Sequence, residues 1–225
     1  MEQKKKIEAK GLKHQEIQID CLVEHPDKKL PIRAWVDSDG ENPPLILSYD
    51  LYEEISHLRP LALELCKLGF NIYAFPMRGH QELKNALAFP SSLHRIALDL
   101  LQVTAWIRKQ EKGKDPFFIA QGFSCLVLFY LLKIHKSYIK GLVLVSPATD
   151  FKKPIEPLKR LAIRWVARMF PKLYLPRFLS PQVYTGVLRD KKRKKVRLQA
   201  RVAEQFLLAS SQARKILART SCQSL

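Results

Sequence analysis

The feature that most constrains this chain of 225 residues is the apolar run from Phe117 to Tyr130, which the short segment Gly122-Phe123-Ser124 interrupts. The residues from Phe117 to Ala120 form a wholly apolar run that is typical of a buried strand. The apolar residues from Leu126 onward are typical of a buried helix. Gly122-Phe123-Ser124 must therefore turn the chain sharply from a strand into a helix.

Such a turn can raise a serine hydroxyl above the carboxyl edge of a sheet when it has the pattern Gly-x-Ser. Gly122 and Ser124 fit that pattern, which predicts Ser124 as a nucleophile on a strained backbone, with its side chain in a cleft. The backbone N–H of the next residue, Cys125, is then expected to face an oxyanion. The match to Gly-x-Ser-x-Gly is partial, because Leu126 stands where the motif has its last glycine. A purely structural alternative is that Ser124 caps the buried helix that follows it.

Composition indicates a globular chain with one sizeable domain, or a domain with a lid, because 47% of the residues are hydrophobic. The cysteines are widely scattered, so we expect a reducing, cytoplasmic environment and neither a metal nor another cofactor; they are Cys21, Cys66, Cys125 and Cys222. The charged start, Met1 to Lys6, argues against a secretory signal. The longest apolar stretch is too short to span a membrane.

The formal net charge of +18 predicts attraction to anionic surfaces, whether lipid head groups or nucleic acid. No segment resembles a module that binds DNA or RNA, and aromatic residues do not alternate with the cations. We therefore expect no nucleic-acid partner.

Apolar periodicity predicts alternating strands and helices after an N-terminal hairpin. The expected hairpin strands lie near residues 17–21 and 30–36, later strands at 45–48, 70–75, 117–120 and 141–146, and helices at 61–68 and 91–107. This order predicts an α/β fold with a mainly parallel sheet and helices on both of its faces. Ligands are then expected at the carboxyl edge of the sheet.

A helical appendage is predicted from Pro147 onward, and its first helix is basic and amphipathic. Its apolar stripe is Leu158, Leu161, Ala162, Trp165, Val166 and Met169, and Lys159, Arg160, Arg164 and Arg168 are expected on the other side. One interpretation is a packed face under a solvated one. The other is an interfacial helix that binds anionic lipid through Arg160, Arg164, Trp165 and Arg168, aided by the basic tract at 189–201.

Together these segments resemble α/β hydrolases of the monoacylglycerol lipase, lysophospholipase and S33 serine aminopeptidase group, over roughly residues 30–218. Arg78-Gly79-His80 is the most specific match, to a family phrase that reads Asp-x-Arg-Gly-His-Gly. Asp99 matches an aspartate in the helix before the serine turn, and residues 141–148 resemble the strand after it. The resemblance implies a hydrolase core over residues 1–149 and a helical cap over residues 150–225.

The resemblance implies a serine hydrolase that cleaves lipid carboxylic esters. Ser124 would attack the acyl carbonyl, and the N–H groups of Cys125 and of a residue near Leu51 would hold the oxyanion. Gly122, Arg78, Gly79 and His80 would support the motif, with His80 ordering its loop. The expected partners are a lipid-like small-molecule substrate and a peripheral anionic membrane surface.

Departures from the family pattern favour a second hypothesis. Tyr49-Asp50 stand where the family has His-Gly, and an aspartate beside the oxyanion donors would repel a developing negative charge. Phe123 replaces the histidine of the turn, and Pro76 replaces the aspartate of the Arg-Gly-His phrase.

The acid and base of the family's triad follow the last two strands of the sheet, and we expect both strands to be missing here. His135 lies about 16 Å along the helix from Ser124, too far to act as its base. The alternative function is therefore a catalytically incomplete homologue, either truncated or non-enzymatic, that binds a lipid or another partner.

Overall fold

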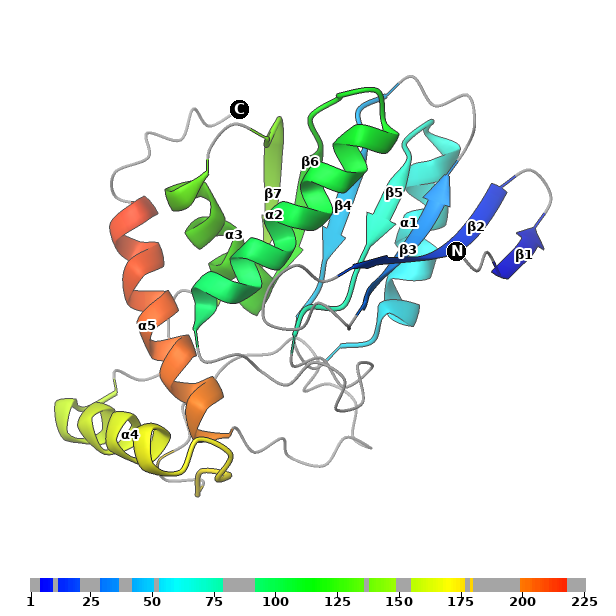
Figure 1. Cartoon of the computed structure of the whole chain (residues 1–225). Coiled ribbons are helices and arrows are strands. Elements are labelled where there is room, and N and C mark those ends of the chain that lie inside the picture. The colour runs from blue at the N-terminus through cyan, green and yellow to red at the C-terminus, as the bar shows by residue number, and fades with distance from the viewer. Residues whose placement is uncertain are drawn as a thin grey trace.

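A seven-stranded mixed sheet with helices on both faces forms the body of the protein (Figure 1). The computed structural model describes residues 5–9, 12–20, 29–36, 42–50, 53–78, 92–135, 138–148, 155–176, 179 and 199–217. The strands are β1 (Lys5–Ala9), β2 (Leu12–Asp20), β3 (Lys29–Val36), β4 (Leu45–Ser48), β5 (Ile72–Ala74), β6 (Phe117–Gln121) and β7 (Gly141–Val145). The helices are η1 (Ile55–Leu58), α1 (Arg59–Lys67), α2 (Leu93–Gln110), α3 (Phe123–Ile134), α4 (Pro157–Met169) and α5 (Ala200–Leu217).

The strand order is β1-β2-β3-β5-β4-β6-β7. Strands β5, β4, β6 and β7 run parallel, and β1, β2 and β3 pair antiparallel with their neighbours. The predicted hairpin and mainly parallel sheet are therefore confirmed. Strand β1 escaped prediction because its sequence, Lys-Lys-Ile-Glu-Ala, is mostly charged and has only two apolar residues.

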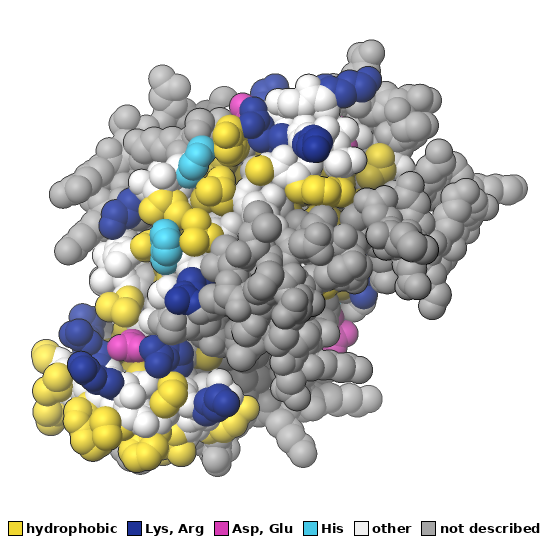
Figure 2. Space-filling model, viewed as in Figure 1, with side chains coloured by type: hydrophobic (Ala, Val, Ile, Leu, Met, Phe, Trp, Pro, Cys, Tyr) yellow, Lys and Arg dark blue, Asp and Glu magenta, His cyan; other side chains and the backbone are white. Residues whose placement is uncertain are grey.

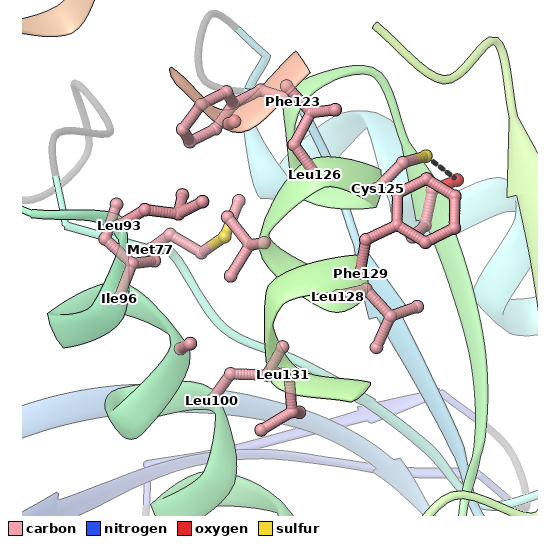
Figure 3. Packing of buried hydrophobic residues seen from close by; sticks show 14 of the residues in the cluster. Met77, Leu93, Ile96, Leu100, Phe123, Cys125, Leu126, Leu128, Phe129 and Leu131 are labelled. Carbon is pink, nitrogen blue, oxygen red and sulfur yellow. Dashed lines mark hydrogen bonds between the residues drawn. The ribbon is translucent and has the colours of Figure 1, made fainter. Parts of the chain in front are cut away.

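Both faces of the central strands are buried, which explains why β4 is apolar from Leu45 to Leu47. Leu45 and Leu47 belong to the cluster that contains Ala62 and Cys66 of α1. Ile46 belongs to the larger cluster, which α2 and α3 share on the opposite face. Figure 3 shows Leu93, Ile96 and Leu100 of α2 pointing toward α3, with Met77 between the two helices.

Glycines with a positive φ follow two of the helices. Gly69 follows α1 with φ +82°, and Gly113 follows α2 with φ +83°. The left-handed region is the usual conformation of a glycine just after a helix, because glycine has no Cβ to clash there.

β7 lies at one edge of the sheet, and no strand follows it within the described residues. Val143 and Val145 project from β7 with exposed fractions of 55% and 42%. Open sheet edges with apolar side chains can pair with another chain.

Helices α4 and α5 form the appendage, and α5 is fixed to the core. Gln205 Oε1 accepts a hydrogen bond of 2.9 Å from the backbone N–H of Leu93, at the first residue of α2. The ring of Phe206 packs on that of Phe123, with centroids 4.4 Å apart. None of the helices described here combines the length and apolar character that crossing a membrane requires. The division into a core and a cap at residue 149 stays a prediction.

A buried ion pair joins the segment after β5 to α2. The guanidinium of Arg78 binds the carboxylate of Asp99 through Nε and Nη2, and the Nη2–Oδ1 distance is 2.9 Å. Both side chains are 1% exposed. Burial raises the pKa of Asp99, and the charge and hydrogen bonds of Arg78 oppose that rise. These are two residues that carry the family resemblance, whereas Gly79 and His80 lie outside the described residues.

We predict that Arg78→Met lowers the free energy of unfolding by about 3–5 kcal/mol, because it leaves the buried Asp99 carboxylate without its countercharge. Urea denaturation followed by circular dichroism measures the change. The double variant Arg78→Met with Asp99→Leu should recover much of the loss. Lys67→Ala, which removes the exposed Lys67–Glu64 pair, is the matched control and should change stability by less than about 1 kcal/mol. Equal losses for Arg78→Met and Lys67→Ala would contradict this account.

Candidate active site

The sharp turn between β6 and α3 is made by Gly122. Its backbone angles are φ 60° and ψ −121°, and α3 begins at the next residue, Phe123. The N–H of Gly122 donates to the carbonyl of Val145 at 3.1 Å, and its own carbonyl accepts from the N–H of Ala148 at 3.3 Å. The strand-to-helix turn is therefore confirmed, and glycine suits it because a positive φ is costly for a residue with a side chain.

Ser124 does not lie at the strained position, and that prediction is wrong. It is the second residue of α3, and its side chain is fully buried rather than open to a cleft. Its Oγ lies 2.7 Å from the carbonyl oxygen of Ser48 and 2.8 Å from that of Gln121, and it accepts a 2.9 Å hydrogen bond from the N–H of Gln121. The hydroxyl thus ties the ends of β4 and β6 to α3. The structural alternative was also inaccurate, since the N-cap residue is Gly122.

The backbone angles place the nucleophile position of the motif two residues earlier than predicted, at Gly122 instead of Ser124. In Gly-x-Ser-x-Gly the nucleophile is the residue at the strained turn, and here that residue is Gly122. Ala120 and Ser124 then take the two small positions on either side, and Leu126 has no special role in the motif. The sequence did carry a signal for this register, because small residues alternate at 120, 122 and 124 around the glycine that favours a positive φ.

This change of register also changes which backbone N–H is expected to face an oxyanion. The backbone N–H after the turn residue belongs to Phe123, not to Cys125, and it donates to Asp50 Oδ1 at 3.1 Å. Asp50 is 1% exposed and follows β4, and its carboxylate lies beside the N–H of Phe123 at the turn. The other predicted donor, Leu51, lies outside the described residues.

The carboxylate of Asp50 also fills the space beside Gly122 where a side chain would begin. A Cβ built on Gly122 would lie 2.6 Å from Cγ and from Oδ2 of Asp50. Real Cβ atoms essentially never approach a neighbour so closely. Gly122 therefore cannot gain a side chain unless the Asp50 carboxylate shifts.

Cys125 is a buried thiol without the properties of a nucleophile. Its Sγ lies 3.1 Å from the carbonyl oxygen of Ala120 (Figure 3). Burial raises the pKa of Cys125 to about 12, and the nearby charge of Asp50 also raises it. Since the thiolate is the reactive form, this thiol stays protonated and unreactive at neutral pH.

The surroundings of the turn are closely packed. Gln121 Nε2 donates to Glu53 Oε1 at 3.0 Å, and α5 covers Phe123 with the ring of Phe206. His135 lies at the opposite end of α3, where its ring stacks on Tyr138, so its predicted distance from Ser124 is consistent with the structure. In the part of the chain that the structure describes, no three His, Cys, Asp or Glu side chains group in a way that could hold a metal ion.

The predicted membrane-binding residues lie elsewhere, on α4. Arg160, Arg164, Trp165 and Arg168 are all exposed, and they lie on the appendage rather than at the turn.

A family model of serine aminopeptidases, S33, matches residues 47–223. A search of curated protein sequences found no match. Many solved structures share the fold, among them a monoacylglycerol lipase from Paleococcus ferrophilus, with a TM-score of 0.61 and 18% sequence identity over 83% of this chain and 72% of that one. A thermostable carboxyl esterase from Bacillus coagulans has a TM-score of 0.64 at 11% identity, over 88% of this chain and 72% of the esterase.

An α/β hydrolase from a Penicillium species is similar to the same degree, with a TM-score of 0.64 and 17% identity over 86% of this chain and 72% of that one. At such low identity these similarities establish the fold. The family model, in contrast, spans well over half of the sequence and includes the end of β4, the Gly122 turn and α5. The chain therefore belongs to the serine aminopeptidase S33 family and has the α/β-hydrolase fold of lipases and esterases.

Proposed function

We propose that this protein keeps the fold of a lipase or esterase but does not hydrolyse esters through its strand-to-helix turn. The observation that carries the proposal is the identity of the turn residue, Gly122, which has no side chain to attack a carbonyl. Covalent ester hydrolysis in this fold needs a nucleophilic side chain at that turn.

The state of the oxyanion site supports the same conclusion. During acyl transfer the carbonyl oxygen gains negative charge, and the N–H after the turn residue must be available to stabilise it. Here that N–H, from Phe123, already binds the carboxylate of Asp50. Asp50 would exclude the substrate oxygen by its volume and repel it by its charge.

Hydrolysis through Ser124 is the competing hypothesis. The Ser124 hydroxyl is buried, and its hydrogen-bond acceptors are the backbone carbonyls of Ser48 and Gln121. A carbonyl oxygen cannot take the proton that a serine must lose to become a nucleophile. The contacts of Ser124 therefore favour a structural role in joining β4, β6 and α3.

A binding role fits the remaining features of the protein. The names of the similar lipase and esterase suggest a lipid-like carboxylic ester as the class of small molecule. We propose that this protein binds lipid-like molecules without cleaving them and associates peripherally with anionic membranes. The net charge of +18 and the exposed apolar and cationic side chains of α4 support the membrane association.

We predict that Gly122→Ala destabilises the protein more than Gly113→Ala does. Both glycines have a positive φ, so each substitution adds backbone strain. Only Gly122 faces a close neighbour, since nothing lies within 4 Å of a Cβ built at Gly113. Urea unfolding should therefore show a larger loss for Gly122→Ala, and the excess should disappear when Asp50→Ala is also present. Equal losses at the two glycines, with or without Asp50, would contradict the placement of the carboxylate.

We also predict that the purified protein does not release p-nitrophenol from short p-nitrophenyl esters, or fatty acid from a monoacylglycerol, above the rate of a protein-free control. Ser124→Ala should leave that background unchanged, although it should cost about 1–3 kcal/mol of stability through its lost hydrogen bonds. Ser210→Ala, at a second buried serine that bonds a backbone carbonyl, is the matched control. Turnover that Ser124→Ala abolishes and Ser210→Ala retains would establish the competing hypothesis.

A further inference from the structure

Helix α4 presents a stripe of large apolar side chains to solvent. Leu158, Leu161, Trp165 and Met169 recur at intervals of three or four residues, so they share one face of the helix. Leu158 is 76% exposed and Trp165 63%, and the other two are more than half exposed. Beyond the helix, Phe170, Leu173 and Tyr174 are also more than half exposed and continue the apolar surface. We call these seven residues the α4 apolar surface.

The α4 apolar surface is not the face that packs on the protein. Ile163 and Ala167 are fully buried, and α4 packs against α5. The interpretation of the predicted stripe as a packed face is therefore wrong, because most of its large residues face solvent. Ile163 and Ala167 fix the helix against the protein, whereas the large apolar side chains of the stripe point toward solvent.

A row of cations runs beside the α4 apolar surface. Arg160, Arg164 and Arg168 are spaced four residues apart and are all exposed. Between residues 157 and 176 the chain has five cations and no acidic residue. The nearest preceding acid, Glu156, pairs with Lys159 at 3.1 Å. The helix thus combines an apolar face, a cationic face and a packed face.

We infer that the α4 apolar surface inserts into the interface of an anionic membrane while Arg160, Arg164 and Arg168 contact the lipid head groups. This inference names the surface for the peripheral association proposed above and rests on that association, not on the loss of ester hydrolysis. Contiguous exposed apolar surface of this kind marks an interaction site. In interfacial helices, apolar side chains reach the acyl boundary and basic ones stay at the head groups. Tryptophan is also enriched at that depth.

The shape and charge of the region favour a lipid surface over a protein partner. Helix α4 projects from one corner of the molecule (Figure 1). Figure 2 shows hydrophobic side chains along the outer margin of this corner, with lysine and arginine side chains immediately beside them. A convex margin can lie on a flat bilayer, and a row of cations with no acid between them complements a uniformly anionic surface.

Vesicle co-sedimentation tests the inference. The full chain should sediment with vesicles of phosphatidylcholine and phosphatidylserine, and less with phosphatidylcholine alone. Leu161→Gln with Trp165→Gln should lower the partition coefficient about tenfold or more, since it removes two large apolar groups from the interface. Both positions are exposed, so the urea midpoint should not change. Leu68→Gln, at an equally exposed leucine after α1, is the matched control and should bind as the unchanged protein does.

Tryptophan fluorescence gives a second readout. Trp35 is buried and Trp106 is half-buried, so Trp165 is the exposed one of the three tryptophans. Its emission should shift to shorter wavelength when vesicles are added, and the shift should be lost in Trp165→Phe. The triple variant Arg160→Glu, Arg164→Glu and Arg168→Glu should bind both kinds of vesicle equally weakly.

The outcomes separate the two proposals. Failure to bind either kind of vesicle would overturn the peripheral association itself. Binding that persists unchanged in Leu161→Gln with Trp165→Gln would keep the association and overturn the α4 apolar surface as its site. Oligomers that size-exclusion chromatography detects in the original chain, and that the same double variant dissociates, would show that this surface binds a second copy instead.

Discussion

The hydrogen bond from the N–H of Phe123 to the carboxylate of Asp50 is the contact on which the account of this site depends. It lies where the ends of β4 and β6 meet the first turn of α3, a helix end at which a negative charge is favourable. The carboxylate has room there only because Gly122 has no Cβ. Ser124 completes the junction with its own hydrogen bonds to Ser48 and Gln121. The N–H that would hold an oxyanion in the proposal above thus binds a side chain of the protein itself.

In this protein the fold does not depend on a catalytic nucleophile. The chain has the α/β-hydrolase fold, and neither its sheet order nor its buried Arg78–Asp99 pair requires a nucleophile. Active sites commonly store strain and unpaired polar groups, at a cost in stability. Here the residue with the positive φ is a glycine, and the buried N–H of Phe123 is bonded to Asp50, so neither feature costs stability at this junction. The appendage remains, with α5 packed on the turn and α4 turned outward.

Much of the fold could be predicted from the sequence, because apolar runs and helical spacing decide which segments are buried. The strands at 45–48 and 117–120 and the helices behind them were predicted for this reason, whereas the charged β1 gave no such signal. The place of Asp50 directly after the strand at 45–48 was also predicted, from the family resemblance. The register of the turn was not, because Gly122 and Ser124 match Gly-x-Ser, and the alternation of small residues at 120, 122 and 124 becomes informative only beside the backbone angles of Gly122. The sequence also left open which face of α4 points outward. Helical periodicity shows which apolar residues share a face, but not whether that face packs on the protein or faces solvent.

Labelling with a fluorophosphonate tests the absence of a nucleophile at this turn most directly. Such a reagent phosphonylates an activated serine with loss of fluoride, so the adduct appears as an added mass on the intact protein and can be located by peptide mapping. The account predicts no adduct on Ser124 or elsewhere on the β6–α3 segment, under conditions in which an active lipase is fully labelled. Stoichiometric labelling of Ser124 would contradict it.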